Sequence, residues 1–226
     1  MKTKLLNWLG REFVEIVGEG KAGVPSDRAA TELFQQFDTE LRGFGLSLDD
    51  TARIRVWGRD RDARTLATAV RSQVLTGTRR AASSSFISRE WFDGTATAGI
   101  ELLALRPRAQ QTKRMPVDFE PARNYLCYLD YDGMLFFSGY TSEAAALEQQ
   151  AIEVLGTIDK ALVRAGTDRR QIVKLSVLLQ RGHDLETVRR AVEKSAVSKS
   201  CEIEFAFVDG FAGEKYLLEI EATAVR

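Results

Sequence analysis

The feature that most constrains the fold is an internal repeat, because the 226-residue chain passes through the same order of predicted elements twice. An offset of about 121 residues aligns the halves, as from Gly45 to Gly166. With small register changes, Ile100-Glu101 matches Ile220-Glu221 and Ala104 matches Ala224. We therefore predict two domains of one fold. Two unrelated α+β domains are the alternative.

Each half is predicted to be a ββαβαββ unit, from its hydrophobic periodicity, helix caps and turn residues. In the first half we expect strands near 5–9 and 12–17, a helix capped by Ser26, a strand at 54–57, a helix at 64–75, and strands at 83–92 and 95–105 around an Asp93-Gly94 turn. In the second half we expect strands at 125–130 and 134–138 around Asp132-Gly133, a helix capped by Thr141-Ser142 and running to Arg164, a strand at 172–179, a helix from Asp184 to near Ala196, and strands at 201–208 and 216–224.

This order predicts an α+β fold in which each domain is a mixed sheet covered on one face by two helices. Strands separated by helices need crossover connections and at least one parallel pair. Each long helix has a single apolar stripe, so the other sheet face must be buried by another domain or subunit. The last strand, 217–224, is apolar on nearly every position, which is typical of a strand buried on both faces. From this face we predict an obligate oligomer.

The predicted organisation is an N-terminal domain at 1–107, a linker at 108–121 and a C-terminal domain at 122–226, because the linker region is polar and rich in proline. With 32 basic and 32 acidic side chains, the net charge is zero, which argues against a nucleic-acid-coating protein. No apolar run is long enough to span a membrane. One histidine and two cysteines exclude multi-histidine and four-thiolate metal sites, and we expect a cytoplasmic protein without metal or cofactor.

The C-terminal half contains a set of specific motifs: Tyr125, Phe136-Phe137-Ser138-Gly139, the Ala165-Gly166 helix end, Ile172-Val173-Lys174-Leu175-Ser176-Val177, and the closing Leu218-Glu219-Ile220-Glu221-Ala222-Thr223-Ala224. In these motifs it resembles the RidA/YjgF family of enamine and imine deaminases. The N-terminal half resembles the pattern weakly. The resemblance implies two RidA-like (chorismate-mutase-like) domains. It also implies trimeric packing of such domains, with sites between neighbours.

The resemblance further implies site residues, which the two halves divide between them. Tyr125, Ser138 and Glu219 match catalytic positions of the family, and Gly139 adjoins them. The family arginine that pairs with a substrate carboxylate is replaced in the C-terminal half by Lys199, two residues before Cys201. The N-terminal half has Arg79-Arg80 at that place and Gly99 in place of the glutamate. One hypothesis is a composite site that joins Arg79 or Arg80 to Tyr125, Ser138 and Glu219. The other is that both sites have decayed.

Three functions stay open on the sequence. The first is cofactor-free hydrolysis of an enamine or imine to a keto acid and ammonia, with a small carboxylate as substrate. The second is a pathway enzyme related to the chorismatases, which also contain paired RidA-like domains. The third is a ligand-binding or assembly module without turnover, either a homo-oligomer or a partner of another RidA-like chain. Neither nucleic acid nor membrane is expected as a partner.

Overall fold

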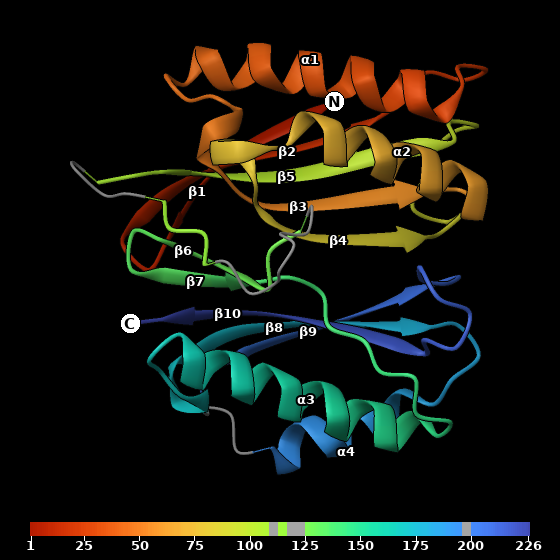
Figure 1. Cartoon of the computed structure of the whole chain (residues 1–226). Helices are drawn as coiled ribbons and strands as arrows, with labels where there is room; N and C mark the ends of the chain where they lie inside the picture. The colour runs from red at the N-terminus through yellow and green to blue at the C-terminus, as the bar shows by residue number, and fades with distance from the viewer. Residues whose placement is uncertain (109–112, 117–124, 196–199) are drawn as a thin grey trace.

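The computed structural model describes residues 1–108, 113–116, 125–195 and 200–226, which form two five-stranded sheets with two helices each (Figure 1). The first half consists of β1 (Lys2–Trp8), β2 (Arg11–Glu19), α1 (Ser26–Gly43), β3 (Thr51–Gly58), α2 (Arg61–Val74), β4 (Ala82–Ile87) and β5 (Ala98–Arg106). The second half consists of β6 (Tyr128–Tyr131), β7 (Met134–Phe137), α3 (Leu147–Arg164), β8 (Ile172–Gln180), α4 (Leu185–Lys194), β9 (Glu202–Val208) and β10 (Leu218–Val225).

The two sheets share one topology, which confirms the repeat. The strand order is β1-β2-β5-β3-β4 in the first and β6-β7-β10-β8-β9 in the second. The pairs that flank the second helices, β3 with β4 and β8 with β9, are parallel, as the crossover argument predicts. The closing strand β10 lies in the centre of its sheet and is buried along nearly all of its length. The α+β class and the tandem arrangement are therefore confirmed.

The predicted hairpin around Asp93-Gly94 is wrong. β4 lies at the sheet edge, whereas β5 lies between β2 and β3, with Leu102 paired to both Ile16 and Ile54. The physical reason is burial. β5 is apolar along most of its length, and a strand in the centre of a sheet is covered more completely than a strand at its edge. The segment after β4 therefore crosses the end of the sheet instead of turning back. The last two strands of the second half are separated in the same way, by β8.

The helix boundaries match the sequence signals in part. Asp184 caps α4 by accepting from the backbone N–H groups of Glu186 and Thr187. Ser26, by contrast, is the first residue of α1, and its hydroxyl donates to Thr97 Oγ1 at 2.8 Å instead of capping the helix. The helix expected after Thr141-Ser142 begins only at Leu147. Ser142 Oγ accepts from the Ala144 N–H at 3.1 Å, so this hydroxyl stabilises a turn ahead of the helix.

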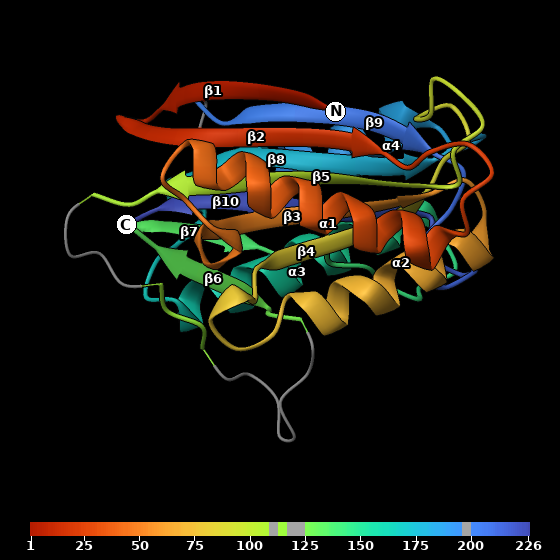
Figure 2. The ribbon, with the colours of Figure 1, turned by 90° about the horizontal axis from the view of Figure 1, so that it is seen from above.

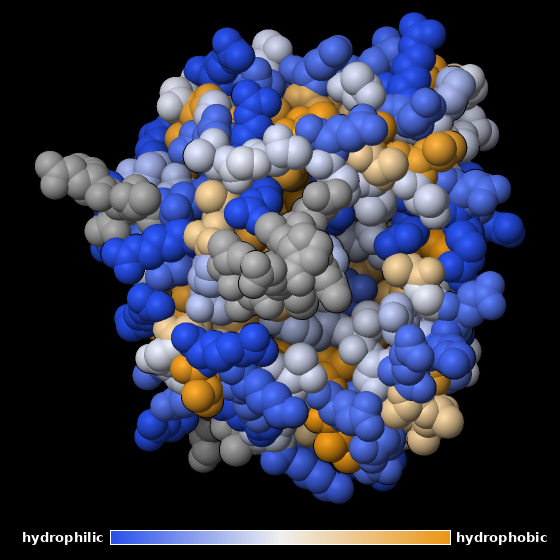
Figure 3. Space-filling view, viewed as in Figure 1, coloured by the Kyte–Doolittle hydropathy of each residue, from blue (hydrophilic) through white to orange (hydrophobic). Residues whose placement is uncertain are grey.

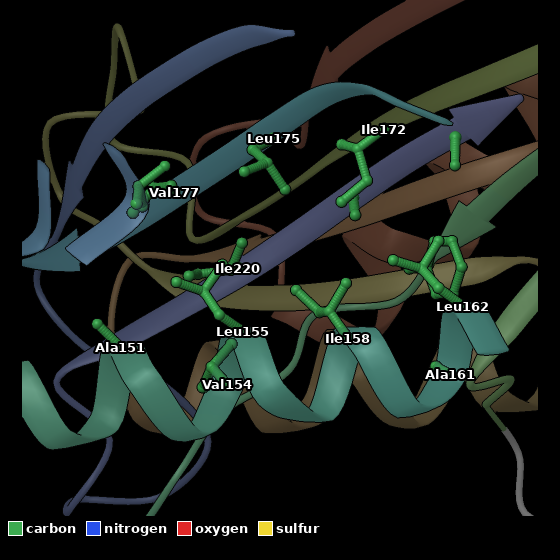
Figure 4. Close-up of a cluster of buried hydrophobic side chains, with 14 of the residues drawn as sticks. Ala151, Val154, Leu155, Ile158, Ala161, Leu162, Ile172, Leu175, Val177 and Ile220 are labelled. Carbon is green, nitrogen blue, oxygen red and sulfur yellow. The ribbon is translucent and has the colours of Figure 1, made fainter. Parts of the chain in front are cut away.

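Each half has its own core between its helices and its sheet. On α3, the predicted stripe of Ala151, Leu155, Ile158 and Leu162 is buried and faces β8 and β10 (Figure 4). The corresponding stripe of α1 is buried against the first sheet. These stripes hold each helix pair on the outer face of its sheet, which leaves the inner faces of the sheets to be covered by something else.

The inner faces of the two sheets cover each other (Figures 1 and 2). Two apolar clusters bridge them at opposite ends, one joining Phe13 to Phe136 and the other joining Phe86 to Phe211. The need for a covering partner is thus met within one chain. This corrects the reasoning that led from an uncovered sheet face to an obligate oligomer, and homo-oligomerisation stays a prediction without that physical reason.

The outer surface seen in Figure 3 is mostly hydrophilic, with hydrophobic residues scattered among polar ones. Within the described residues, no helix is both long and apolar enough to cross a membrane. The first sheet ends at Arg106 and the second begins at Tyr128, and much of the predicted 108–121 linker lies outside the described residues. The domain boundaries stay a prediction.

Candidate functional site

The two halves meet closely where β4 of the first half approaches the end of β7. The backbone N–H of Ser83 donates to Ser138 Oγ at 3.0 Å, and the N–H of Gly139 donates to the Ser83 carbonyl at 3.3 Å. Ser138 Oγ in turn donates to the Leu126 carbonyl. These contacts join segments that lie far apart in sequence and fix Ser138 and Gly139 against the N-terminal half.

Glu219 on β10 lies behind this junction and is only 6% exposed. A Cβ on Gly139 would lie 1.7 Å from Glu219 Oε1, so only a glycine lets the carboxyl group occupy this place. Its Oε1 atom is buried without a hydrogen-bond partner. Burial, reinforced by the charge of Glu221, raises the pKa of Glu219 to about 8. Glu219 can therefore both donate and accept a proton near neutral pH.

Glu221, two residues further along the same strand, has the opposite character. Arg55 binds its two oxygens at 2.7–3.2 Å, and Arg53 Nε lies 3.6 Å from Glu221 Oε2. Burial alone would raise the pKa of Glu221, but the two guanidinium groups outweigh it and lower the pKa to about 2. Two neighbouring carboxyl groups with separated pKa values suit one group to proton transfer and the other to a fixed charge.

One face of α2 presents polar groups at the same junction. Arg64, Thr68 and Arg71 follow helical spacing, and Arg64 Nε donates to Ser85 Oγ on β4 at 3.1 Å. Both arginines lie within electrostatic reach of Glu219. The buried Thr68 Oγ1 and Ser83 Oγ atoms have no hydrogen-bond partner, whereas the Ser84 hydroxyl interacts with Glu219 and Glu221. Since buried polar atoms are normally paired, unpaired hydroxyls at this junction are suited to a polar ligand.

The arginines of α2 are cations without a carboxylate partner. Among the described residues, Arg71 has one hydrogen bond, from Nη2 to Ser72 Oγ at 3.3 Å, and neither it nor Arg64 has a carboxylate at ion-pair distance. Arg71 is 8% exposed, and burial lowers its pKa to about 10. A buried guanidinium that lacks an acid within the protein can be stabilised by an anionic ligand.

The structure brings some of the sequence-predicted residues together. Ser138, Gly139 and Glu219 lie side by side at the junction. Tyr125, 38% exposed, lies one residue before Leu126, whose carbonyl Ser138 contacts. The catalytic roles of these residues, and the composite site as a whole, stay predictions.

Other predicted residues lie elsewhere. Arg79 is exposed and lies 3.7 Å from Asp49 in an ion pair, and the neighbouring Arg80 lies near the buried Lys113. Cys201 packs against the helix-covered core of its own half, and burial raises the pKa of its thiol, which disfavours a nucleophilic role. Lys199 lies outside the described residues. Among the described residues, the charges of Arg64, Arg71 and Arg55 act on Glu219 instead.

The sequence did not single out Arg64 and Arg71, because the family resemblance was traced through the strands and their flanking residues and not through α2. The available signal was their spacing, since Arg64, Thr68 and Arg71 lie beside the apolar stripe Ala63, Ala67 and Val70 of the same helix. Polar residues next to an inward-facing stripe point to an interface. Within the described residues, no group of three or more metal-ligating side chains occurs.

Comparison with known proteins agrees with this architecture. Residues 115–226 match the family model described as Endoribonuclease L-PSP, which confirms the predicted resemblance of the C-terminal half to the RidA/YjgF family. A crystal structure of chorismatase matches 100% of this chain and 80% of its own, at 17% identity and a TM-score of 0.66, which is a likeness of fold.

Smaller proteins match about one half of the chain. A YjgF-family protein from Mycobacterium tuberculosis matches 51% of this chain and 100% of its own, at 19% identity and a TM-score of 0.47. RidA from the Antarctic bacterium Psychrobacter matches 50% and 100%, at 16% identity and a TM-score of 0.45. No curated protein matches the chain by sequence.

Proposed function

We propose that the chain binds a small carboxylate-bearing metabolite between its halves and hydrolyses an enamine or imine of that metabolite to a keto acid and ammonia. The single observation that carries the proposal is Glu219, a buried carboxyl group with a pKa of about 8 and an unpaired oxygen, near the buried Arg71 and the half-buried Arg64, neither of which has a carboxylate at ion-pair distance among the described residues. The likeness of the C-terminal half to the RidA/YjgF family supports the reaction class.

The reaction needs one acid-base group and no cofactor. The protonated Glu219 gives its proton to the enamine carbon, which leaves an iminium ion on the substrate. The resulting carboxylate takes a proton from water while the water oxygen bonds to the iminium carbon. Glu219 then gives this proton to the amine nitrogen of the adduct. The C–N bond breaks, ammonia leaves, and the C=O group of the keto acid forms as the hydroxyl proton returns to Glu219, which ends the cycle protonated. The positive charge of Arg71 and Arg64 holds the substrate carboxylate.

A second candidate is turnover of a chorismate-like carboxylate, and the chorismatase fold over the whole chain favours it. The same residues would act, because that reaction also needs a fixed cation and an acid-base carboxyl group. A binding module without turnover is the third candidate, since an anion site needs only the arginines. A cytoplasmic location is part of the same proposal.

The test is ammonia release from 2-aminoacrylate generated in situ, with chorismate consumption measured in parallel. We expect ammonia release by the native chain, its loss in Glu219→Gln and at least a tenfold decrease in Arg71→Met. Arg79→Met is the matched control and should retain activity, because Arg79 pairs with Asp49 on the surface. Activity that survives Glu219→Gln contradicts the mechanism. Binding of 2-ketobutyrate without turnover of either substrate would favour the binding module.

A further inference from the structure

A second cleft lies between the two sheets, on the side of the molecule away from the Ser83–Ser138 contact. It has a volume of about 500 Å³ and is lined by strands of both halves, including the edge strands β1 and β9. Figure 2 shows these two edge strands on the same side of the molecule, opposite β4 and β6. Two of its lining residues, Arg53 and Arg55, also bind Glu221, whereas Glu219 and Glu221 themselves do not line the cleft.

The cleft contains two buried polar atoms without hydrogen-bond partners, Arg53 Nε, whose nearest carboxylate oxygen is Glu221 Oε2 at the ion-pair distance of 3.6 Å, and Thr223 Oγ1. The other end of Arg53 is occupied, since its Nη2 donates to the carbonyls of Ala222 at 2.7 Å and Phe137 at 3.3 Å. The Nε–H group can only donate, and the hydroxyl of Thr223 can donate as well. The two groups together are suited to an oxygen acceptor from a ligand.

The charges of the cleft do not favour a free anion. Arg55 is bound by Glu221 and Glu101, and Lys174 is bound by Glu202 at 2.9 Å and by Glu204 at 3.2 Å. The cations of the lining are thus already matched by carboxylates, and Glu15 adds a further negative charge. A carboxylate ligand would gain little attraction from Arg55 and Lys174, and Glu15 would repel it. An uncharged carbonyl oxygen can accept hydrogen bonds from Arg53 Nε and Thr223 Oγ1 without this repulsion.

The wall formed by β1 and β2 is apolar. Leu6, Trp8 and Phe13 line it, and Leu6 is 37% exposed although Phe13 beneath it is fully buried. An apolar wall with a few convergent polar groups is the usual composition of a small-molecule site. The cleft therefore combines an acceptor-binding floor with a surface for an apolar body.

We propose that this cleft binds an uncharged amphipathic molecule that carries an amide or ketone carbonyl and an apolar body. The carbonyl oxygen accepts from Arg53 Nε and Thr223 Oγ1, and the apolar body lies against Leu6, Trp8 and Phe13. Binding in this cleft does not depend on turnover at Glu219, because neither Glu219, Ser138 nor Gly139 lines it, although Arg53 and Arg55 are shared with Glu221.

The test uses three probes that share one ring and differ in charge: phenylacetamide, phenylacetate and phenethylamine. Titration calorimetry on the full chain should show that phenylacetamide binds at least tenfold more tightly than the two charged probes. Thr223→Val keeps the side-chain shape and removes the hydroxyl, so it should weaken phenylacetamide binding about five- to tenfold. Thr157→Val on the exposed face of α3 is the matched control and should leave binding unchanged.

A second pair of variants tests the apolar wall. Leu6→Ser should weaken phenylacetamide binding by at least threefold, whereas Ile152→Ser, at an exposed position of α3, should not. Equal binding of phenylacetate and phenylacetamide would overturn the proposal, as would full affinity in Thr223→Val. Sedimentation as a dimer that Leu6→Ser dissociates would also overturn it, because the edge of β1 would then be occupied by a second copy.

Discussion

Glu219 and Glu221 face the same interior from one strand, yet their pKa values lie about six pH units apart. The difference is made by their neighbours. Arg55 and Arg53 come from β3 of the other half and reach Glu221, so that Glu219 is left with burial as its main influence. Two residues along β10 thus separate a structural ion, Glu221, from a candidate acid-base group, Glu219.

This contrast predicts opposite effects of pH on stability. The pKa of Glu219 in the folded protein exceeds its ordinary value of 4.5, so stability falls as pH rises from about 4.5 to about 8. Glu219→Gln removes the ionisation and should be more stable than the native chain at pH 9, by on the order of 3 kcal/mol, with little difference at pH 5. Thermal unfolding across this range measures the effect.

Glu221→Gln is the matched control on the same strand. The pKa of Glu221 lies below 4.5 in the folded protein, so its stabilisation is present above about pH 4.5 and is lost as pH falls toward 2. The substitution also leaves Arg53 and Arg55 without this partner. We expect it to destabilise the protein at neutral pH by roughly 3 kcal/mol. Similar pH profiles for the two variants would contradict the assignment of the two carboxyl groups.

The burial of Arg71 should lower the stability of the fold while serving the binding of an anion. Its guanidinium is buried without a carboxylate partner, so Arg71→Met exchanges a costly charge for an apolar side chain of similar length. We expect the unfolding free energy of Arg71→Met to rise by about 1 kcal/mol while anion binding at the junction is lost. Denaturant titrations and 2-ketobutyrate calorimetry check the two effects. A variant that loses stability and keeps binding would show that Arg71 serves only the fold.

At the scale of elements, the position of α2 decides whether Arg64 and Arg71 reach the junction. β3 ends at Gly58 and α2 starts at Arg61, so a very short connection sets the helix against the sheet. A Cβ on Gly58 would lie 2.2 Å from the backbone nitrogen of Arg64. Glycine is therefore required at this position for the close approach, even though its φ angle is not in the left-handed region.

Gly58→Ala should therefore move the start of α2 and destabilise the protein by about 2 kcal/mol or more, because the clash is with backbone. Gly156→Ala on α3 provides the control. No atom lies within 4 Å of its added methyl group, and alanine is a better helix former, so we expect a gain of about 0.5–1 kcal/mol. Urea titrations of both variants measure these changes. A neutral Gly58→Ala would show that α2 can shift freely.

At the scale of the whole molecule, the two halves are joined by more than the linker. They share two apolar clusters, the ion pairs of Glu221 and a backbone contact from the Ile87 N–H to the Gly210 carbonyl at 2.9 Å. Neither sheet has another cover for its inner face within the described residues. Each half should therefore depend on the other for its stability.

We expect the halves to unfold in one cooperative transition. All three tryptophans, Trp8, Trp57 and Trp91, lie in the N-terminal half and in the two clusters that join the halves, so tryptophan fluorescence reports on that half and on its contact with the other. Far-UV circular dichroism reports on both halves. Their urea midpoints should coincide. A fluorescence transition at a lower urea concentration than the loss of the circular dichroism signal would indicate independent domains. The sedimentation coefficient without urea tests the predicted oligomer separately.

The sequence by itself determined the repeat, the α+β class, the order of the elements and the burial of the closing strand on both faces. These follow from local periodicity and from burial on both faces, which the residues of one strand or helix encode. The motif residues Ser138, Gly139 and Glu219 could be chosen in the same way, since they belong to one contiguous family pattern.

Only the tertiary structure decided which surfaces meet. It showed that the two sheets cover each other, that β5 enters between β2 and β3, and that Arg64 and Arg71 of α2 approach Glu219 while Arg79 pairs with Asp49. These facts depend on contacts between residues that lie far apart in the chain. Such contacts leave no local period in the sequence, because the energy of an ion pair or a packed interface depends on distance in space.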